Sequence, residues 1–136
     1  MFYLLKEHNG ATNVGDAVEI IAAAGTYPLC SALTSAGALA TGSAKAEYLC
    51  MEGGTKGKTL SEKGALYCIH VSDEMVFETE LVGTWEAAPE AGKAYQFSSD
   101  GTTITPTTAT AGSGAVVLHT PDTYTEGTKV RVKLKV

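Results

Sequence analysis

The chain has 136 residues, the length of one domain, and a domain of this size buries roughly two thirds of its unfolded surface without a metal or a disulfide. Its apolar content of 44% and charged content of 18% are ordinary for a globular protein, and its formal net charge of −5 is opposite in sign to a nucleic-acid-binding surface. We therefore expect one domain over residues 1–136, without a nucleic-acid partner.

The N-terminal residues MFYLLKEHNG contain the first β-prone run, residues 2–6. Five apolar residues with no basic residue before them are too few for the apolar region of a secretory signal. The longest apolar run, residues 17–25, contains Glu19 and is far shorter than the roughly 20 residues that cross a bilayer. We expect a soluble protein that is made in the cytosol and has no membrane partner.

Short β-prone runs continue along the chain, and turn signals rich in Gly, Asn, Asp and Ser separate them. This spacing is typical of a β-sandwich or β-barrel and leaves little room for helices. We expect an all-β module of hairpins with at most a short helix. The predicted strands are residues 2–6, 17–22, 46–51, 65–71, 75–82, 94–98, 102–106, 115–120 and 129–136.

Two segments lie outside this pattern. Residues 31–46 are rich in alanine, which favours helix, but Gly37 and Gly42 interrupt a long one, so a short helix and an irregular loop both fit. Residues 83–93 have the composition of a linker and mark a possible sub-boundary, although we expect a single domain. Trp85 within them is expected to pack its ring on the edge of the barrel.

The dipeptide Asp100-Gly101 is the strongest hairpin signal in the chain, because a two-residue type I′ turn needs positive φ at both positions. It predicts that residues 94–98 pair with residues 102–106.

The chain ends on a strict alternation of basic and apolar residues, KVRVKLKV. Lys129, Arg131, Lys133 and Lys135 form the basic row of this predicted strand. Residues 73–82, DEMVFETELV, place acidic side chains on one face of another strand. We expect the two strands to be neighbours with their opposite charges paired. Contact between the basic row and an acidic partner protein is the alternative.

Three cysteines, Cys30, Cys50 and Cys68, are spaced 20 and 18 residues apart without a CxxC pair. Each lies among apolar residues, so we expect buried thiols rather than a disulfide framework. Cys68 and His70 are expected on the same face of one strand, as two zinc ligands could be, but the sequence offers no second pair of ligands. A half-buried histidine bonded to its sheet is the simpler interpretation, and no metal or cofactor is expected.

No motif predicts catalysis. EGGTKGKT at residues 52–59 resembles a phosphate-binding loop, but Glu52 replaces the first glycine and Gly64 interrupts the helix that such a loop requires. His70 and His119 are candidate bases, yet no serine or cysteine stands in a nucleophile motif. We therefore expect no enzyme, and rank a small barrel enzyme using either histidine last.

Over most of its length, the chain resembles the head decoration, or cement, proteins of tailed bacteriophages. The residues that carry the resemblance are AVEII, YPLCSALT, AEYLCM and IHVSDEMVFET, followed by the C-terminal series SSDGTTIT, GAVVL and EGTKVRVKL. The likeness lies in the order of strands and turns rather than in an invariant signature.

This resemblance implies a β-tulip-like, partly barrel-shaped module that forms homotrimers on the capsid exterior and binds the major capsid protein. It also implies an N-terminal arm that docks on the shell by β-strand addition or apolar anchoring, here Phe2, Tyr3, Leu4 and Leu5. The chain would be synthesised in the host cytoplasm and function in the virion. The alternative is a carbohydrate- or host-binding β-module of a phage tail or cell surface, in which Trp85, Tyr95 or Tyr124 stacks on sugar rings.

Overall fold

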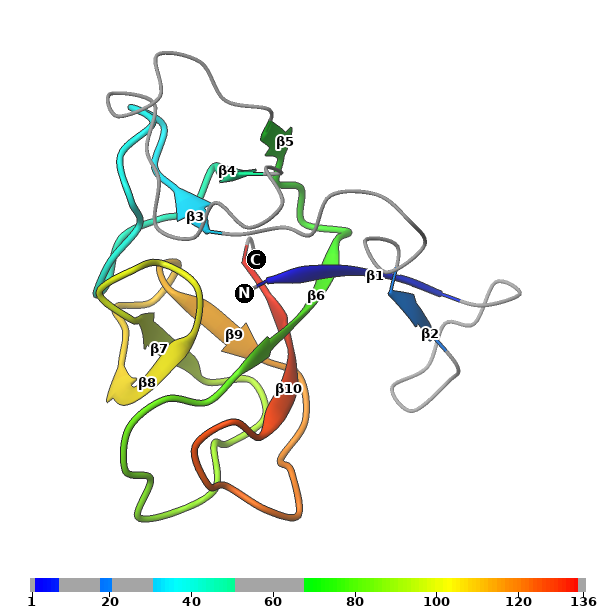
Figure 1. The fold of residues 1–136 in the computed structure, drawn as a ribbon, viewed down its shortest axis with the longest axis vertical. Helices are drawn as coiled ribbons and strands as arrows, with labels where there is room; N and C mark the ends of the chain where they lie inside the picture. Colours follow the sequence, from blue (N-terminus) through cyan, green and yellow to red (C-terminus); the bar gives the residue numbers. More distant parts are fainter. Residues whose placement is uncertain (1, 8–17, 21–30, 51–67, 135–136) are drawn as a thin grey trace.

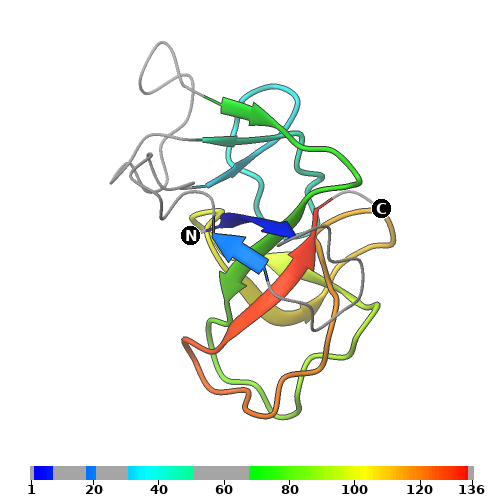
Figure 2. The ribbon, with the colours of Figure 1, turned by 90° about the vertical axis from the view of Figure 1, so that its right-hand side faces the viewer.

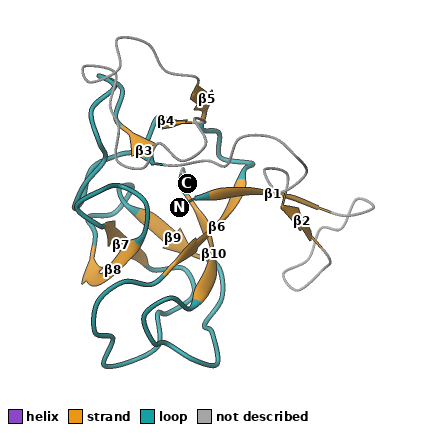
Figure 3. Ribbon diagram, in the orientation of Figure 1, coloured by secondary structure: helices purple, strands orange, loops and turns teal. Residues whose placement is uncertain are grey.

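The computed structural model describes residues 2–7, 18–20, 31–50 and 68–134. These residues form ten strands and no helix, which confirms the predicted all-β fold (Figure 3). Within this part of the chain, no helix could cross a membrane. The strands that the structure describes match all nine predicted runs, and a tenth, β3, is additional.

Seven strands form one sheet in the order β2-β1-β6-β10-β9-β7-β8, and every neighbouring pair in it is antiparallel. Strand β10 therefore lies between β6 and β9. The bounds of these strands are β1 Tyr3–Glu7, β2 Val18–Ile20, β6 Val76–Glu80, β7 Ala94–Phe97, β8 Ile104–Thr108, β9 Ala115–Val117 and β10 Lys129–Lys133.

Five of these strands, β6, β10, β9, β7 and β8, form a small barrel. The barrel closes because β6 and β8, which are not neighbours in the sheet order, meet at their ends. Leu81, directly after β6, forms a parallel bridge with Ile104 of β8, and the Val82 amide donates to the Ile104 carbonyl at 2.9 Å. The β1–β2 ribbon leaves this barrel from the side of β6 (Figures 1 and 2). The sequence left a β-sandwich and a β-barrel both open, and these contacts give the barrel arrangement, with a ribbon added to it.

A second sheet has three antiparallel strands in the order β3-β4-β5: Ala32–Leu33, Tyr48–Cys50 and Cys68–His70. Residues 31–46, for which a short helix or a loop was expected, contain β3 and irregular backbone. Gly42 and Phe97 exchange two backbone hydrogen bonds of 3.1 and 2.9 Å, which tie this segment to β7 of the barrel.

One cluster of buried apolar side chains serves both sheets. In the barrel strands the side chains alternate between this core and the outside, as the period-two pattern predicted: Phe77 and Thr79 of β6 are buried, while Glu78 and Glu80 between them are only half-buried. From the three-stranded sheet, Ala32 and Leu49 join the same cluster.

The connection between β7 and β8 differs from the predicted two-residue turn, although the two strands do pair. Phe97 pairs with Ile104, so six residues connect them. The Asp100 carboxylate organises this connection: it accepts hydrogen bonds from the Thr102 amide at 3.1 Å and from the hydroxyls of Ser98 and Thr102 at 2.7 and 2.6 Å. An aspartate that bonds nearby backbone favours such a wider turn.

Residues 83–93 connect β6 to β7 within the barrel. Trp85 is buried and its ring packs on Tyr95 of β7, with the ring centroids 5.1 Å apart, which confirms the expectation that it packs on the barrel. The Gly92 amide donates to the carbonyl of Val117 on β9 at 2.7 Å. The strands on both sides of this segment, β6 and β7, belong to the same sheet.

Candidate functional site

The N-terminal residues predicted to dock on a shell belong to the folded body of the structure. Phe2 is completely buried and packs edge-to-face on Phe97, with 5.7 Å between the ring centroids. An aromatic side chain in this position stabilises the core and is not available as an external anchor. This differs from the expectation of an apolar arm that includes Phe2.

The backbone of Tyr3, Leu4 and Leu5 pairs with Glu78, Phe77 and Val76 of β6, and β2 pairs with the second half of β1. Over these three residues, one edge of β1 is therefore already occupied by β6, and Leu5 is paired on both sides. Among the described residues, β2 does not pair with Tyr3 and Leu4, so a strand could be added to these two residues on that side. Their role in docking stays a prediction.

The basic row of β10 faces the acidic face of β6, as predicted. Lys129 lies opposite Glu80, and Arg131 lies opposite Glu78. The Leu81 amide donates to the Thr128 carbonyl at 2.9 Å, which makes both charged pairs non-hydrogen-bonded pairs, where opposite side chains lie closest. Internal charge pairing thus accounts for this part of the row.

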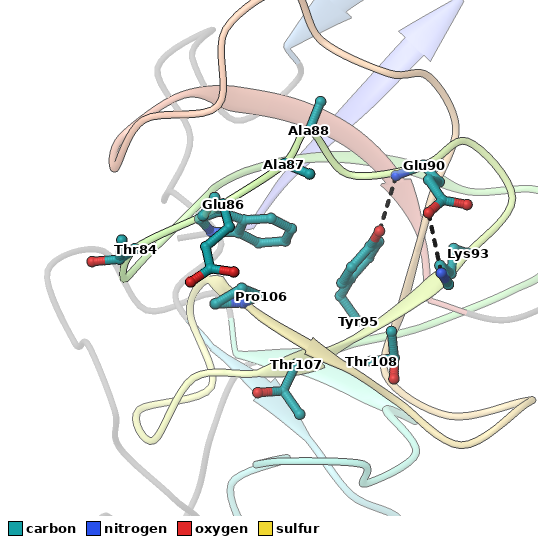
Figure 4. Close-up of a pocket in the computed structure, with 11 residues that line it drawn as sticks. Thr84, Glu86, Ala87, Ala88, Glu90, Lys93, Tyr95, Pro106, Thr107 and Thr108 are labelled. Atoms are coloured by element: carbon teal, nitrogen blue, oxygen red, sulfur yellow. Dashed lines mark hydrogen bonds and ion pairs between the residues drawn. The ribbon is translucent and has the colours of Figure 1, made fainter.

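A pocket of about 400 Å³ opens between the connection 83–93 and the barrel strands β7 and β8 (Figure 4). Its lining combines two aromatic rings with hydroxyl, carboxylate and ammonium groups. The lining residues are Thr84, Trp85, Glu86, Ala87, Ala88, Glu90, Lys93, Tyr95, Pro106, Thr107 and Thr108.

Hydrogen bonds hold the aromatic wall of the pocket in place. The Tyr95 hydroxyl accepts from the Glu90 amide at 2.9 Å (Figure 4). The Trp85 indole N–H donates to the Val82 carbonyl at 3.1 Å. Lys93 Nζ lies 3.2 Å from Glu90 Oε1, which leaves the exposed Glu86 carboxylate without an ion pair among the described residues. The pocket lining therefore includes the exposed Glu86 and three threonines, which are polar residues that a ligand could contact.

The aromatic residues predicted to stack on sugars differ in exposure. Trp85 is 8% exposed and Tyr95 is 5% exposed, so neither offers a full ring face to a ligand. Tyr124 is 40% exposed and lies outside the pocket lining. Of these three residues only Tyr124 is exposed enough to stack as predicted, whereas Trp85 and Tyr95 are buried residues of the pocket lining.

The two histidines considered as bases lie apart from the pocket lining. His119 Nε2 accepts a hydrogen bond from the Arg131 amide at 3.1 Å, so this nitrogen carries no proton. Burial, together with the charge of Arg131, lowers the pKa of His119 below its ordinary value of 6.5. Its observed contact is a structural link between the segment after β9 and β10.

His70 and Cys68 lie on β5 and are exposed, which corrects the expectation of a half-buried histidine and of a buried thiol at Cys68. His70 Nε2 is 3.7 Å from Glu47 Oε2, and its ring lies 5.1 Å from that of Tyr48. Among the described residues, no three potential ligands gather around a metal position. Cys30 and the loop-like motif 52–59 lie outside the described residues.

No family model, curated protein or solved structure matches this chain.

Proposed function

We propose that the chain is a non-enzymatic structural protein of a phage virion, which binds the outer surface of the capsid and stabilises it. The observation that carries the proposal is that the residues of the C-terminal resemblance and the IHVSDEMVFET run contribute to four of the five barrel strands, β6, β8, β9 and β10. A barrel-shaped module is what the resemblance implies, so this arrangement supports the proposal.

A compact barrel suits a decoration role because binding to a closed shell needs a rigid body rather than a reactive centre. Many identical weak contacts around a shell add by avidity, so each copy needs only a modest surface. The major capsid protein is the proposed partner, and a homotrimer placed where capsomers meet is the proposed assembly.

Co-sedimentation with undecorated shells tests the proposal. Shells are assembled from the major capsid protein encoded in the same genome, mixed with increasing amounts of the purified chain and pelleted. Saturable binding at a fixed ratio per shell subunit is the expected result, and the solution mass should be three times that of one chain. Pelleted protein that rises linearly without saturation contradicts the proposal.

A second candidate is a module that binds carbohydrate, and the pocket with its exposed Glu86 carboxylate favours it. Small-molecule sites combine apolar and aromatic walls with a few polar groups, and the exposed Glu86 side chain supplies such a group in this lining. Tyr124 is the competing position, because it is the exposed large aromatic residue among those that the structure describes.

A glycan-array screen followed by two variants separates these positions. Loss of a reproducible signal in Glu86→Gln but not in Tyr124→Ala places the sugar in the pocket. The reverse result places it on Tyr124. Both side chains are exposed, so neither change should disturb folding. A screen without reproducible hits removes this candidate.

A further inference from the structure

Two of the three cysteines lie directly opposite each other on neighbouring strands. Cys50 of β4 and Cys68 of β5 are register partners in the antiparallel three-stranded sheet (Figure 1). The sequence gives no hint of this, because the two residues are 18 positions apart and form no CxxC motif. Only the pairing of the strands brings them together.

The hydrogen bonds of this strand pair show which kind of position the cysteines occupy. The Val71 amide donates to the Glu47 carbonyl at 2.9 Å, which marks these two residues as a hydrogen-bonded pair. Pairs alternate along an antiparallel ladder, so Leu49 and Ile69 are again a hydrogen-bonded pair. Cys50 and Cys68 therefore form a non-hydrogen-bonded pair.

Non-hydrogen-bonded pairs are the ones in which opposite residues approach most closely, with α-carbons about 4.5 Å apart. Disulfides join residues whose α-carbons are roughly 4.4–6.8 Å apart. The backbone of β4 and β5 thus holds Cys50 and Cys68 at a separation that a disulfide can bridge without moving the strands.

Small reagents in solution can reach this position from the side of Cys68. Cys68 is exposed, and His70, two residues further along the same face of β5, has a side chain that is 62% exposed. The opposite face of the sheet carries Leu49, which is buried in the core. The face that carries Cys68 is therefore the outer face of the sheet.

We propose that Cys50 and Cys68 are a redox modification site that forms a reversible cross-strand disulfide by exchange with a low-molecular-weight disulfide. The thiolate of one cysteine attacks a sulfur of the small disulfide and releases its first thiol. The second cysteine then displaces the other half as a second thiol. The two protein thiols are oxidised to one S–S bond, and the small disulfide is reduced to two thiols.

The bond would close a loop around residues 51–67 and fix β5 to β4. Cross-linking restricts the unfolded chain, so the oxidised protein should be the more stable form. Thiols remain reduced in a cytosol and oxidise outside it. The bond would thus form after the protein leaves the compartment in which it is made, and the fold itself does not depend on it.

Peptide mapping tests the proposal directly, because trypsin separates the three cysteines. Cleavage after Lys6, Lys45, Lys56, Lys63 and Lys93 places Cys30 on peptide 7–45, Cys50 on peptide 46–56 and Cys68 on peptide 64–93. The folded protein is treated with oxidised glutathione, blocked with an alkylating reagent and digested without reduction. Peptides 46–56 and 64–93 are expected as one linked species.

Melting curves give a second readout. Oxidation should raise the melting temperature of the wild type and of Cys30→Ser by at least about 5 °C. Oxidation should leave the melting temperature of Cys68→Ser unchanged, and the same is expected for Cys50→Ser. Linkage of either peptide to 7–45, glutathione adducts without the internal bond, or no oxidation at all would overturn the proposal. If a variant fails to fold, the peptide map of the wild type and of Cys30→Ser still decides.

Discussion

The ammonium of Lys129 on β10 lies 3.9 Å from the carboxylate of Glu78 on β6. This is a diagonal contact, because the residue directly opposite Lys129 in the strand register is Glu80. The row of cations near the end of an acidic chain thus lies against a row of anions. Strands with opposite charges on their outer faces and apolar residues on their inner faces specify each other as neighbours. The observed register fulfils both conditions.

Reversing the charge at Lys129 should weaken the fold by about 0.5–1 kcal/mol, because Lys129→Glu places like charges beside Glu78 and Glu80. Adding Glu78→Lys should restore part of the loss. Urea unfolding at low and high salt measures both, and the difference should shrink with salt. Lys45→Glu is the control, since Lys45 is exposed and outside this pair of strands. Equal effects of the two reversals would contradict specific pairing.

Phe2→Ala should destabilise the protein by about 3–5 kcal/mol, since it removes a fully buried ring from its contact with Phe97. Chemical denaturation measures the loss. Tyr124→Ala, at an exposed ring, should change stability by less than about 0.5 kcal/mol. If Phe2 were an external anchor, its removal would reduce shell binding and leave the unfolding midpoint unchanged.

Thr79→Val tests a buried hydrogen bond that joins β6 to the β7–β8 connection. The Thr79 hydroxyl donates to the Thr102 carbonyl at 2.9 Å, and valine keeps the shape while leaving this carbonyl without its donor. We expect a loss of about 1–3 kcal/mol. Thr105→Val removes a longer, partly exposed bond to the Gln96 carbonyl, at 3.4 Å, and should cost much less. Similar losses in both variants would argue against a special role for Thr79.

Gly114 is a position where only glycine fits, for two separable reasons. Its φ is +67°, and an added Cβ would lie 2.3 Å from the Tyr95 carbonyl oxygen and 2.6 Å from the Ala109 Cβ. Gly112 has a φ of +81° but open space around it. Gly112→Ala should therefore lose about 1 kcal/mol to backbone strain, while Gly114→Ala should lose several times more. The difference in stability loss between the two variants, measured by thermal unfolding, gives the contribution of the steric clash at Gly114. Equal losses would contradict such a clash.

His119 should make the stability depend on pH. Its pKa is lowered in the folded protein, so the unfolded chain takes up a proton first as the pH falls below 6.5. Stability is therefore full above pH 6.5 and decreases as the pH falls from there through the folded pKa. His119→Gln keeps an acceptor for the Arg131 amide and should flatten the urea midpoints between pH 7.5 and 5.5. His70→Gln, at an exposed ring, should retain the dependence.

The sequence predicted what depends on local alternation and missed what depends on distant pairing. Period-two patterns placed β6 and β10 correctly and identified them as neighbours through their charges. The two-residue strand β3 has no such pattern, and the preference of alanine for helix obscured it. The Leu81–Ile104 bridge joins residues far apart in sequence through backbone groups, which carry no sequence signal.

Candidate binding residues were predicted less well, because exposure is a property of the packed molecule. Trp85 and Phe2 are both large aromatic residues in polar or terminal surroundings, and each could be a ligand or shell contact on composition alone. The core takes up both rings. Glu86 was not singled out from the sequence, because an isolated glutamate in a linker-like segment has no distinguishing pattern. Its place in the pocket lining becomes visible only in the folded structure.

The placement of β10 between β6 and β9 has a consequence for biosynthesis. A nascent chain that has emerged from the ribosome as far as β9 holds two strands with unsatisfied edges and cannot complete its barrel. Strand β10 pairs with both of these edges, so the barrel can close only after β10 has been translated. A product truncated before Lys129 should be recognised by chaperones and proteases as unfinished.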